Sequence, residues 1–204
     1  MDLSSLTPST SPLTSQLTTS TYKRKGTAKM ISDQDLEHLR LAVSLAHEAL
    51  EAGDAPFGSV LVSSENKVLQ TDRNRTVTGS NGDGRADSTL HPEFTLARWA
   101  QLNLSDEERA KSTVYTSGEH CAMCSSAHAW CGLGRIVYAS STEQLEAWKA
   151  EFGVKAPVAP LSINQVAPGL TVEGPVEELA KQVYQFQVES WTAKGFKPKS
   201  KSKA

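Results

Sequence analysis

Two short segments of the chain carry the side chains best suited to chemistry. His91-Pro92-Glu93 places an imidazole and a carboxylate two residues apart, and Cys121-Ala122-Met123-Cys124 places two thiols three residues apart. Zinc favours cysteine sulfur and histidine nitrogen, and a catalytic zinc ion keeps three protein ligands and a fourth position open to water. The histidine and the two cysteines match that ligand set, and Glu93 remains as a free acid. A purely structural zinc site is the alternative.

Both segments are predicted to begin helices. Proline loses no hydrogen bond in the first turn of a helix, so Pro92 predicts a helix from about His91 through Trp99. A second helix is expected over Cys121–Trp130. The N-terminus of a helix stabilises thiolates through its dipole and its free N–H groups, which favours metal binding over free thiols.

The rest of the chain alternates between helical and strand patterns. Apolar residues at steps of three and four after the capping residue Ser32 predict a helix that ends at Gly53. Strands are expected at Phe57–Ser63, Val68–Arg73, Ser112–Thr116 and Arg135–Ser140, and further helices near Thr142–Ala150 and Glu177–Trp191. This alternation predicts an α/β sandwich with crossover connections.

The composition of the 204 residues indicates one domain with polar extensions. Three cysteines are too few for a disulfide framework, so we expect a reducing compartment and a cytoplasmic location. No run approaches the roughly 18 apolar residues of a membrane helix, so we expect a soluble protein. The Ser/Thr-rich segment 1–30 is predicted to be a disordered extension. A mitochondrial transit peptide is less favoured there, because the first arginine is Arg24.

The formal net charge of −2 hides an uneven distribution. The predicted domain, residues 31–193, holds 12 basic and 22 acidic residues, whereas the predicted flexible tail, residues 194–204, holds five lysines. Nucleic acids are bound by neutralising phosphates with lysine and arginine. The acidic domain therefore argues against a polynucleotide groove, and we expect no nucleic-acid partner.

The two segments resemble the signature of the cytidine deaminase-like superfamily, whose zinc deaminases carry His-x-Glu followed by Pro-Cys-x-x-Cys. Ala55–Val62 and Asp72–Arg75 resemble the first hairpin of its guanine deaminase and tRNA adenosine deaminase branch, and Trp130–Tyr138 resembles the stretch after the second cysteine. The resemblance covers about residues 31 to 150. It implies a three-layer α/β/α sandwich with a central mixed sheet of about five strands, and a homodimer or larger assembly.

The resemblance also implies roles for individual residues. His91, Cys121 and Cys124 match the Zn²⁺ ligands, and Glu93 matches the group that moves protons during hydrolytic deamination. The implied substrate is a small aminated nucleobase or nucleoside, from which ammonia is released.

Two further residues are candidates for contact with the substrate. Asn74 matches the asparagine with which the family contacts its substrate, although an asparagine at this position is equally typical of a turn. Phe57 is expected to wall the substrate pocket, and core packing is an equally good interpretation of its strand context.

Two histidines require separate interpretation. His120 stands where the family motif has proline. Adjacent positions at a helix start point in different directions, so we expect a rim or surface histidine rather than a fourth ligand or a pocket acid. His128 shares a helical face with both cysteines, and its binding would close the site. We expect a packed or interface histidine there, because a ligand one turn deeper would sit away from the ion.

The other notable side chains have simpler interpretations. Phe94, Trp99 and Trp130 are expected to pack on helix faces rather than to stack on bases, and Cys131 is expected to be a small core residue.

Three functions fit the sequence. A zinc deaminase of a guanine-like purine is favoured, because the hairpin resembles that branch. A tRNA adenosine deaminase is the rival, in which the basic ends assist RNA binding against the charge of the domain. A non-catalytic zinc-folded binding module is the third, and it would have no use for Glu93.

Overall fold

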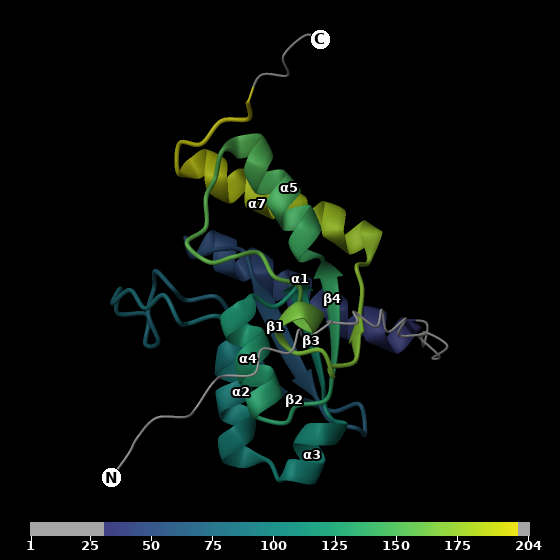
Figure 1. Ribbon diagram of the computed structural model, residues 1–204. Helices are drawn as coiled ribbons and strands as arrows, with labels where there is room; N and C mark the ends of the chain where they lie inside the picture. Colours follow the sequence, from purple (N-terminus) through teal and green to yellow (C-terminus); the bar gives the residue numbers. More distant parts are fainter. Residues whose placement is uncertain (1–30, 200–204) are drawn as a thin grey trace, which may run out of the picture. The chain divides into compact units, whose positions relative to one another are not determined.

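The computed structural model describes residues 31–199. The predicted extension 1–30 and residues 200–204 of the predicted tail lie outside the described residues. Helices and strands alternate along most of the described chain (Figure 1). The elements in chain order are α1 (Asp33–Glu51), β1 (Gly58–Val62), β2 (Val68–Arg73), α2 (Pro92–Asn103), α3 (Asp106–Lys111), β3 (Thr113–Gly118), α4 (Ala122–Trp130), β4 (Arg135–Ser140), α5 (Thr142–Phe152), α6 (Ile163–Val166), β5 (Val172–Glu173) and α7 (Glu177–Ala193).

The five strands form one mixed sheet in the order β2-β1-β3-β4-β5. Strand β1 is antiparallel to β2 and to β3, with Val60 opposite Tyr115. Strands β3, β4 and β5 run parallel to one another. The sheet confirms the predicted α/β fold with a mixed sheet of about five strands.

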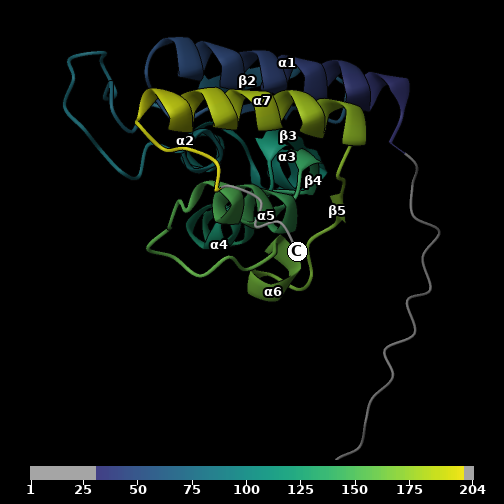
Figure 2. The same ribbon diagram turned by 90° about the horizontal axis from the view of Figure 1, so that it is seen from above.

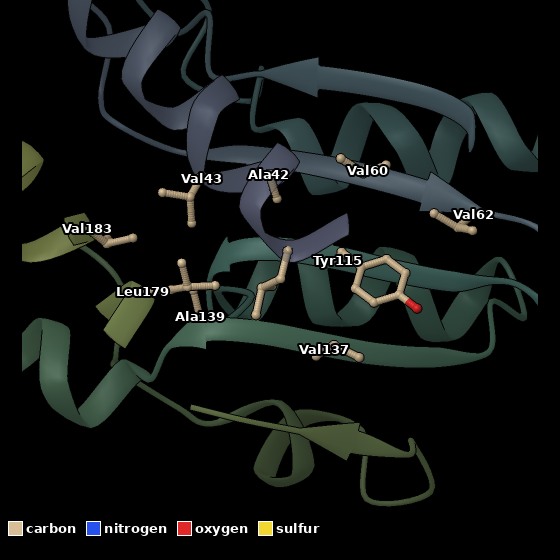
Figure 3. Packing of buried hydrophobic residues seen from close by; sticks show 10 residues of the cluster. Ala42, Val43, Val60, Val62, Tyr115, Val137, Ala139, Leu179 and Val183 are labelled. Atoms are coloured by element: carbon tan, nitrogen blue, oxygen red, sulfur yellow. The ribbon is translucent and has the colours of Figure 1, made fainter. Parts of the chain in front are cut away.

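Helices cover both faces of this sheet (Figure 2). Side chains alternate in direction along a strand. Val60 and Val62 therefore pack with α1 and α7, whereas Leu61 between them packs with α2. Figure 3 shows the larger cluster, to which α1 contributes Val43, α7 contributes Val183, and β1 contributes Val60 and Val62. The three predicted layers are therefore present in the described residues.

The differences from the predicted elements have physical reasons. Strand β3 continues two residues beyond the predicted end at Thr116, because Gly118 still pairs with Ser140. Helix α2 continues four residues beyond Trp99, to Asn103. The elements α3, α6 and β5 were not predicted. Helix α3 has the sequence DEERAK, which shows no apolar periodicity, and α6 and β5 are only four and two residues long.

The chain after α7 returns to α5. The N–H of Phe196 donates to the carbonyl of Trp191 (3.0 Å), and the N–H of Lys199 donates to the carbonyl of Glu151 (2.9 Å). The flexibility of the lysine-rich end stays a prediction. Among the described helices, none combines the length and the apolar character that crossing a membrane requires.

A buried ionic network joins α1 to three strands. Asp35, in the capping box of α1, is 5% exposed, and Arg135 of β4 donates to both its oxygens at 2.6 and 3.2 Å. The hydroxyl of Tyr115 in β3 donates to the same carboxylate (2.7 Å), and Arg135 also pairs with Glu173 of β5. Burial alone would raise the pKa of Asp35, but the hydrogen bonds from Arg135, Ser32 and Tyr115 hold it well below its usual range.

We expect Asp35→Asn to lower the free energy of unfolding by about 3 kcal/mol at neutral pH, because it leaves Arg135 buried without its main counter-charge. A carboxylate with a depressed pKa in the folded state stabilises the fold above its unfolded pKa of about 3.9, and this stabilisation is lost as the pH falls. The difference in the free energy of unfolding between wild type and variant, measured with urea, should therefore be largest at pH 7 and smaller below about pH 4. Equal differences at pH 7 and pH 3 would contradict a stabilising role of the Asp35 carboxylate.

Candidate active site

Two helix starts bring the three predicted zinc ligands together. His91 and Cys121 occupy the N-cap positions of α2 and α4, and neither side chain caps its own helix by a hydrogen bond. Cys124 lies in the first turn of α4. The two sulfurs are 3.6 Å apart, and each lies 3.7 Å from Nδ1 of His91. The three ligand atoms therefore form a nearly equilateral triangle.

The triangle fits a tetrahedral zinc ion. With Zn–S bonds of about 2.3 Å and Zn–N bonds of about 2.0–2.1 Å, tetrahedral geometry places ligand atoms about 3.6–3.8 Å apart. Among the described residues, these three are the group of histidine, cysteine and acidic side chains that could hold a metal. Three ligands leave the fourth position of such an ion open.

The electrostatics of the two thiols also favour a bound cation. The hydrogen bond from Cys124 and the proximity of His91 lower the pKa of Cys121 to about 4, in spite of its burial. The pKa of Cys124 is raised, because its sulfur donates to Cys121, because it is buried and because Glu93 is near. A second thiolate beside the first is therefore unfavourable without a positive charge, which a divalent cation would supply.

Glu93 lies beside the triangle and is not part of it. Its side chain is 5% exposed, Oε1 accepts a hydrogen bond from the hydroxyl of Thr116 (2.9 Å), and Oε2 lies 3.5 Å from the sulfur of Cys124. Burial raises the pKa of Glu93, and a raised carboxyl pKa is typical of groups that carry protons in active sites. The position suits a proton carrier next to a metal-activated water.

Asn74 lies at the end of β2, close to the same site. Its backbone N–H donates to the carbonyl of Phe57 (2.9 Å), and the N–H of the next residue, Arg75, donates to the carbonyl of Leu90 (3.1 Å), which directly precedes His91. Asn74 is 1% exposed. The structure thus brings the predicted substrate asparagine near the ligand histidine, and its contact with substrate stays a prediction.

Phe57 lies between β1 and the end of β3. A Cβ atom added at Gly118 would stand 2.9 Å from Cε1 of Phe57, so the ring rests on the glycine that begins the connection to Cys121. The phenylalanine is half-buried. The geometry is compatible with a pocket wall, and this role also stays a prediction.

The structure contradicts the predicted position of His120. Its side chain is 1% exposed and lies in the interior, edge-on to His128 with ring centroids 5.4 Å apart. The two-residue extension of β3 carries the chain inward before α4 begins. Neither ring nitrogen of His120 has a hydrogen-bond partner among the described residues. His128 is buried, as predicted for a packed histidine, and its Nε2 lies 3.0 Å from the carbonyl of Gly134.

The aromatic predictions have mixed outcomes. Trp99 and Cys131 are partly buried against the apolar cluster that Leu61 forms with α2, as predicted. Phe94 is half-buried. The prediction for Trp130 is wrong, because its side chain is 89% exposed at the last position of α4.

Two polar residues of the site were missed by sequence reasoning. Thr116 was treated only as part of a strand, yet it holds Glu93 and accepts from the hydroxyl of Ser59 (2.9 Å). Asp54 was not singled out, yet it is 1% exposed and binds the segment that follows Asn74. Asp54 belongs to the Asp-Ala-Pro-Phe-Gly run at the start of the hairpin, which was the available signal.

Comparison with known proteins places this geometry in a family. Residues 32–140 match the family described as the cytidine and deoxycytidylate deaminase zinc-binding region. Over 115 residues, the chain is 35% identical to a probable cytosine deaminase of Schizosaccharomyces pombe, covering 56% of this chain and 65% of that protein. It is 36% identical to guanine deaminase of Bacillus subtilis, covering 56% and 68%. A tRNA-specific adenosine deaminase of Buchnera aphidicola is 29% identical, covering 57% and 73%.

The chain spans just under two thirds of the length of the Schizosaccharomyces pombe protein. A solved structure of guanine deaminase from Nitrosomonas europaea shares the fold, with a TM-score of 0.59 and 20% identity over 78% of this chain and 86% of that one. The family match covers more than half of the chain and includes both helix starts that carry the ligand triangle. The chain belongs to the cytidine and deoxycytidylate deaminase zinc-binding family.

Proposed function

We propose that this protein is a zinc-dependent hydrolytic deaminase of a small aminated nucleobase or nucleoside, with a guanine-like purine as the favoured substrate. The observation that carries the proposal is the buried carboxylate of Glu93 beside an open three-ligand triangle. A closed structural zinc site needs four ligands and has no use for such an acid.

His91, Cys121 and Cys124 would hold the ion. Bound zinc would supply a Lewis acid that lowers the pKa of a water molecule at its open position. Glu93 would accept one proton from that water and deliver it to a ring nitrogen of the substrate, and would then carry a second proton from the same oxygen to the departing amine, which leaves as ammonia. Thr116 keeps Oε1 of Glu93 in place, which leaves Oε2 as the oxygen nearer the ligands.

The preference for a purine rests on the hairpin Ala55–Val62, which resembles the guanine deaminase and tRNA adenosine deaminase branch. Guanine deaminase of Bacillus subtilis is 36% identical and the probable cytosine deaminase 35% identical over 115 residues each, so these identities favour neither base. Cytosine is therefore the first alternative substrate to include in any assay.

A tRNA substrate is the rival within the same chemistry. The similarity to tRNA-specific adenosine deaminases supports it. The net charge of −10 between positions 31 and 193 opposes it, because RNA binding depends on neutralising phosphates. A small-molecule substrate fits this charge better.

A homodimer forms part of the proposal, and two exposed apolar side chains support it. Leu102 of α2 is 73% exposed and Trp130 of α4 is 89% exposed, on two helices that pack against each other. Large apolar side chains that are exposed in a monomer can mark protein interfaces, and tryptophan is enriched among the residues that contribute most to binding. A cytoplasmic location stays a prediction from the cysteine content.

The zinc ligands generate the first prediction here. Cys124→Ser should reduce zinc from about one ion per chain to well below half, since serine is a poor zinc ligand. Cys131→Ser is the matched control, because Cys131 lies outside the triangle. Elemental analysis of both proteins after gel filtration measures the difference. Equal zinc contents in the two variants would exclude the ligand assignment.

The second prediction concerns Glu93. Glu93→Gln keeps the shape of the side chain but cannot carry the proton, so ammonia release should fall by roughly 10²–10⁴-fold while zinc is retained. The assay offers guanine, adenine, cytosine, their nucleosides and a tRNA anticodon stem to wild type and variant. Release from RNA alone would favour the tRNA rival. Equal behaviour of wild type and variant in every assay would favour the non-catalytic module.

The third prediction concerns the homodimer. Trp130→Ser should shift the protein from dimer to monomer at micromolar concentration, measured by light scattering after size exclusion. Val158→Ser is the control, because Val158 is 54% exposed but lies in the loop between α5 and α6. A monomeric wild type, or a dimer in both variants, would refute an interface that includes Trp130.

A further inference from the structure

Asp54 is a buried acid outside the ligand triangle that the proposed mechanism does not use. It lies three residues after α1, and its side chain accepts four hydrogen bonds. The donors are the N–H of Val77 (2.7 Å), the N–H of Thr78 (3.1 Å), the hydroxyl of Thr78 (2.7 Å) and Nη1 of Arg73 (2.8 Å). Burial alone would raise the pKa of Asp54, but the bonds from Thr78, Val77 and Arg73 lower it, so the group is ionised at neutral pH.

These bonds hold the chain on both sides of Asn74. Arg73 precedes Asn74, and its Nη1 donates both to Asp54 and to the carbonyl of Asn74 (2.8 Å). Val77 and Thr78 follow Asn74 and begin the loop between β2 and α2 (Figure 1). One carboxylate therefore fixes the end of β2 and the first turn of the loop at the same time.

The side chain of Asn74 is oriented by the same turn. Its Oδ1 accepts from the N–H of Thr76 (3.1 Å) and from the hydroxyl of Thr76 (2.8 Å). A backbone N–H is always a donor, so the amide atom that faces it must be the oxygen. The amide nitrogen, which donates to no other described residue, is the part left for a ligand. Such a donor recognises an acceptor atom, either a ring nitrogen or a carbonyl oxygen.

We infer that Asp54 is a positioning residue for substrate recognition, which through Arg73 and the turn at Val77 and Thr78 presents the amide nitrogen of Asn74 to an acceptor atom of the base. The inference rests on the proposed function and deepens it. The base is held by a hydrogen bond from Asn74, and Asp54 sets the strength of that bond without touching the base.

Steady-state kinetics of three variants test this role. Asp54→Asn should raise KM by roughly tenfold with little change in kcat, because it weakens about one hydrogen bond to the base and leaves Glu93 in place. Asn74→Ala should raise KM at least as much. Adding Asp54→Asn to Asn74→Ala should raise KM no further, because the effect of Asp54 passes through Asn74.

Asp35→Asn is the matched control. Asp35 is also a buried carboxylate paired with an arginine, but its partners lie at the other end of α1 and in the core strands. This variant should lose stability with KM unchanged. Independent, multiplicative effects of Asp54→Asn and Asn74→Ala on KM would overturn the inference, as would an unchanged KM in Asp54→Asn.

Hydrogen exchange separates the failure of this inference from the failure of the proposed function. Asp54→Asn should accelerate exchange of the Val77 and Thr78 amides relative to those of β1 and β3, and Asp35→Asn should not. If wild type releases no ammonia from any substrate, the proposed function fails and this measurement still applies. Unchanged relative exchange in Asp54→Asn would then overturn the positioning role.

Discussion

The hydrogen bond between Thr116 and Glu93 connects the central sheet to the acid that is proposed to carry protons. A buried carboxyl without a partner is costly, so α2 must enter at the level where Thr116 can reach Glu93. The same strand ends at Gly118, three residues before Cys121, and the same helix begins directly after His91. This one contact therefore sets how the helix start with the histidine meets the helix start with the cysteines. Ser59 of the neighbouring strand supports Thr116 from the other side.

The helices and strands that could be predicted are those that a local sequence pattern determines. The capping box at Ser32 and the apolar spacing after it determine α1, and runs rich in β-branched, aliphatic or aromatic residues determine β1 and β4. The short elements have no such pattern. Strand β5 is two residues long and exists because Val172 pairs with Ile136 of β4, a contact across 36 positions that no local pattern contains.

The residues of the candidate site fall into the same two groups, those that a local pattern places and those that only packing places. The ligand residues were predictable, because each lies in the first turn or at the N-cap of a helix that the sequence marks clearly. His120 and Trp130 were assigned to the wrong environments, because the depth of a side chain depends on where the preceding strand ends and on how far a helix extends beyond its layer. Those are properties of packing, and the residue types at the two positions do not determine them.

This difference bears on substrate choice within the family. The ligand half is built from two local segments, and relatives named for action on different substrates, cytosine, guanine and tRNA adenosine, match 115 to 117 residues of this chain. The recognition half is built from contacts across 20 or more positions, such as Asp54 with Val77 and Thr78. From the inferred role of Asp54, we expect changes in the loop between β2 and α2 to alter recognition without replacing a metal ligand. The zinc motif alone would then specify the reaction and leave the choice of substrate to this loop and its anchor.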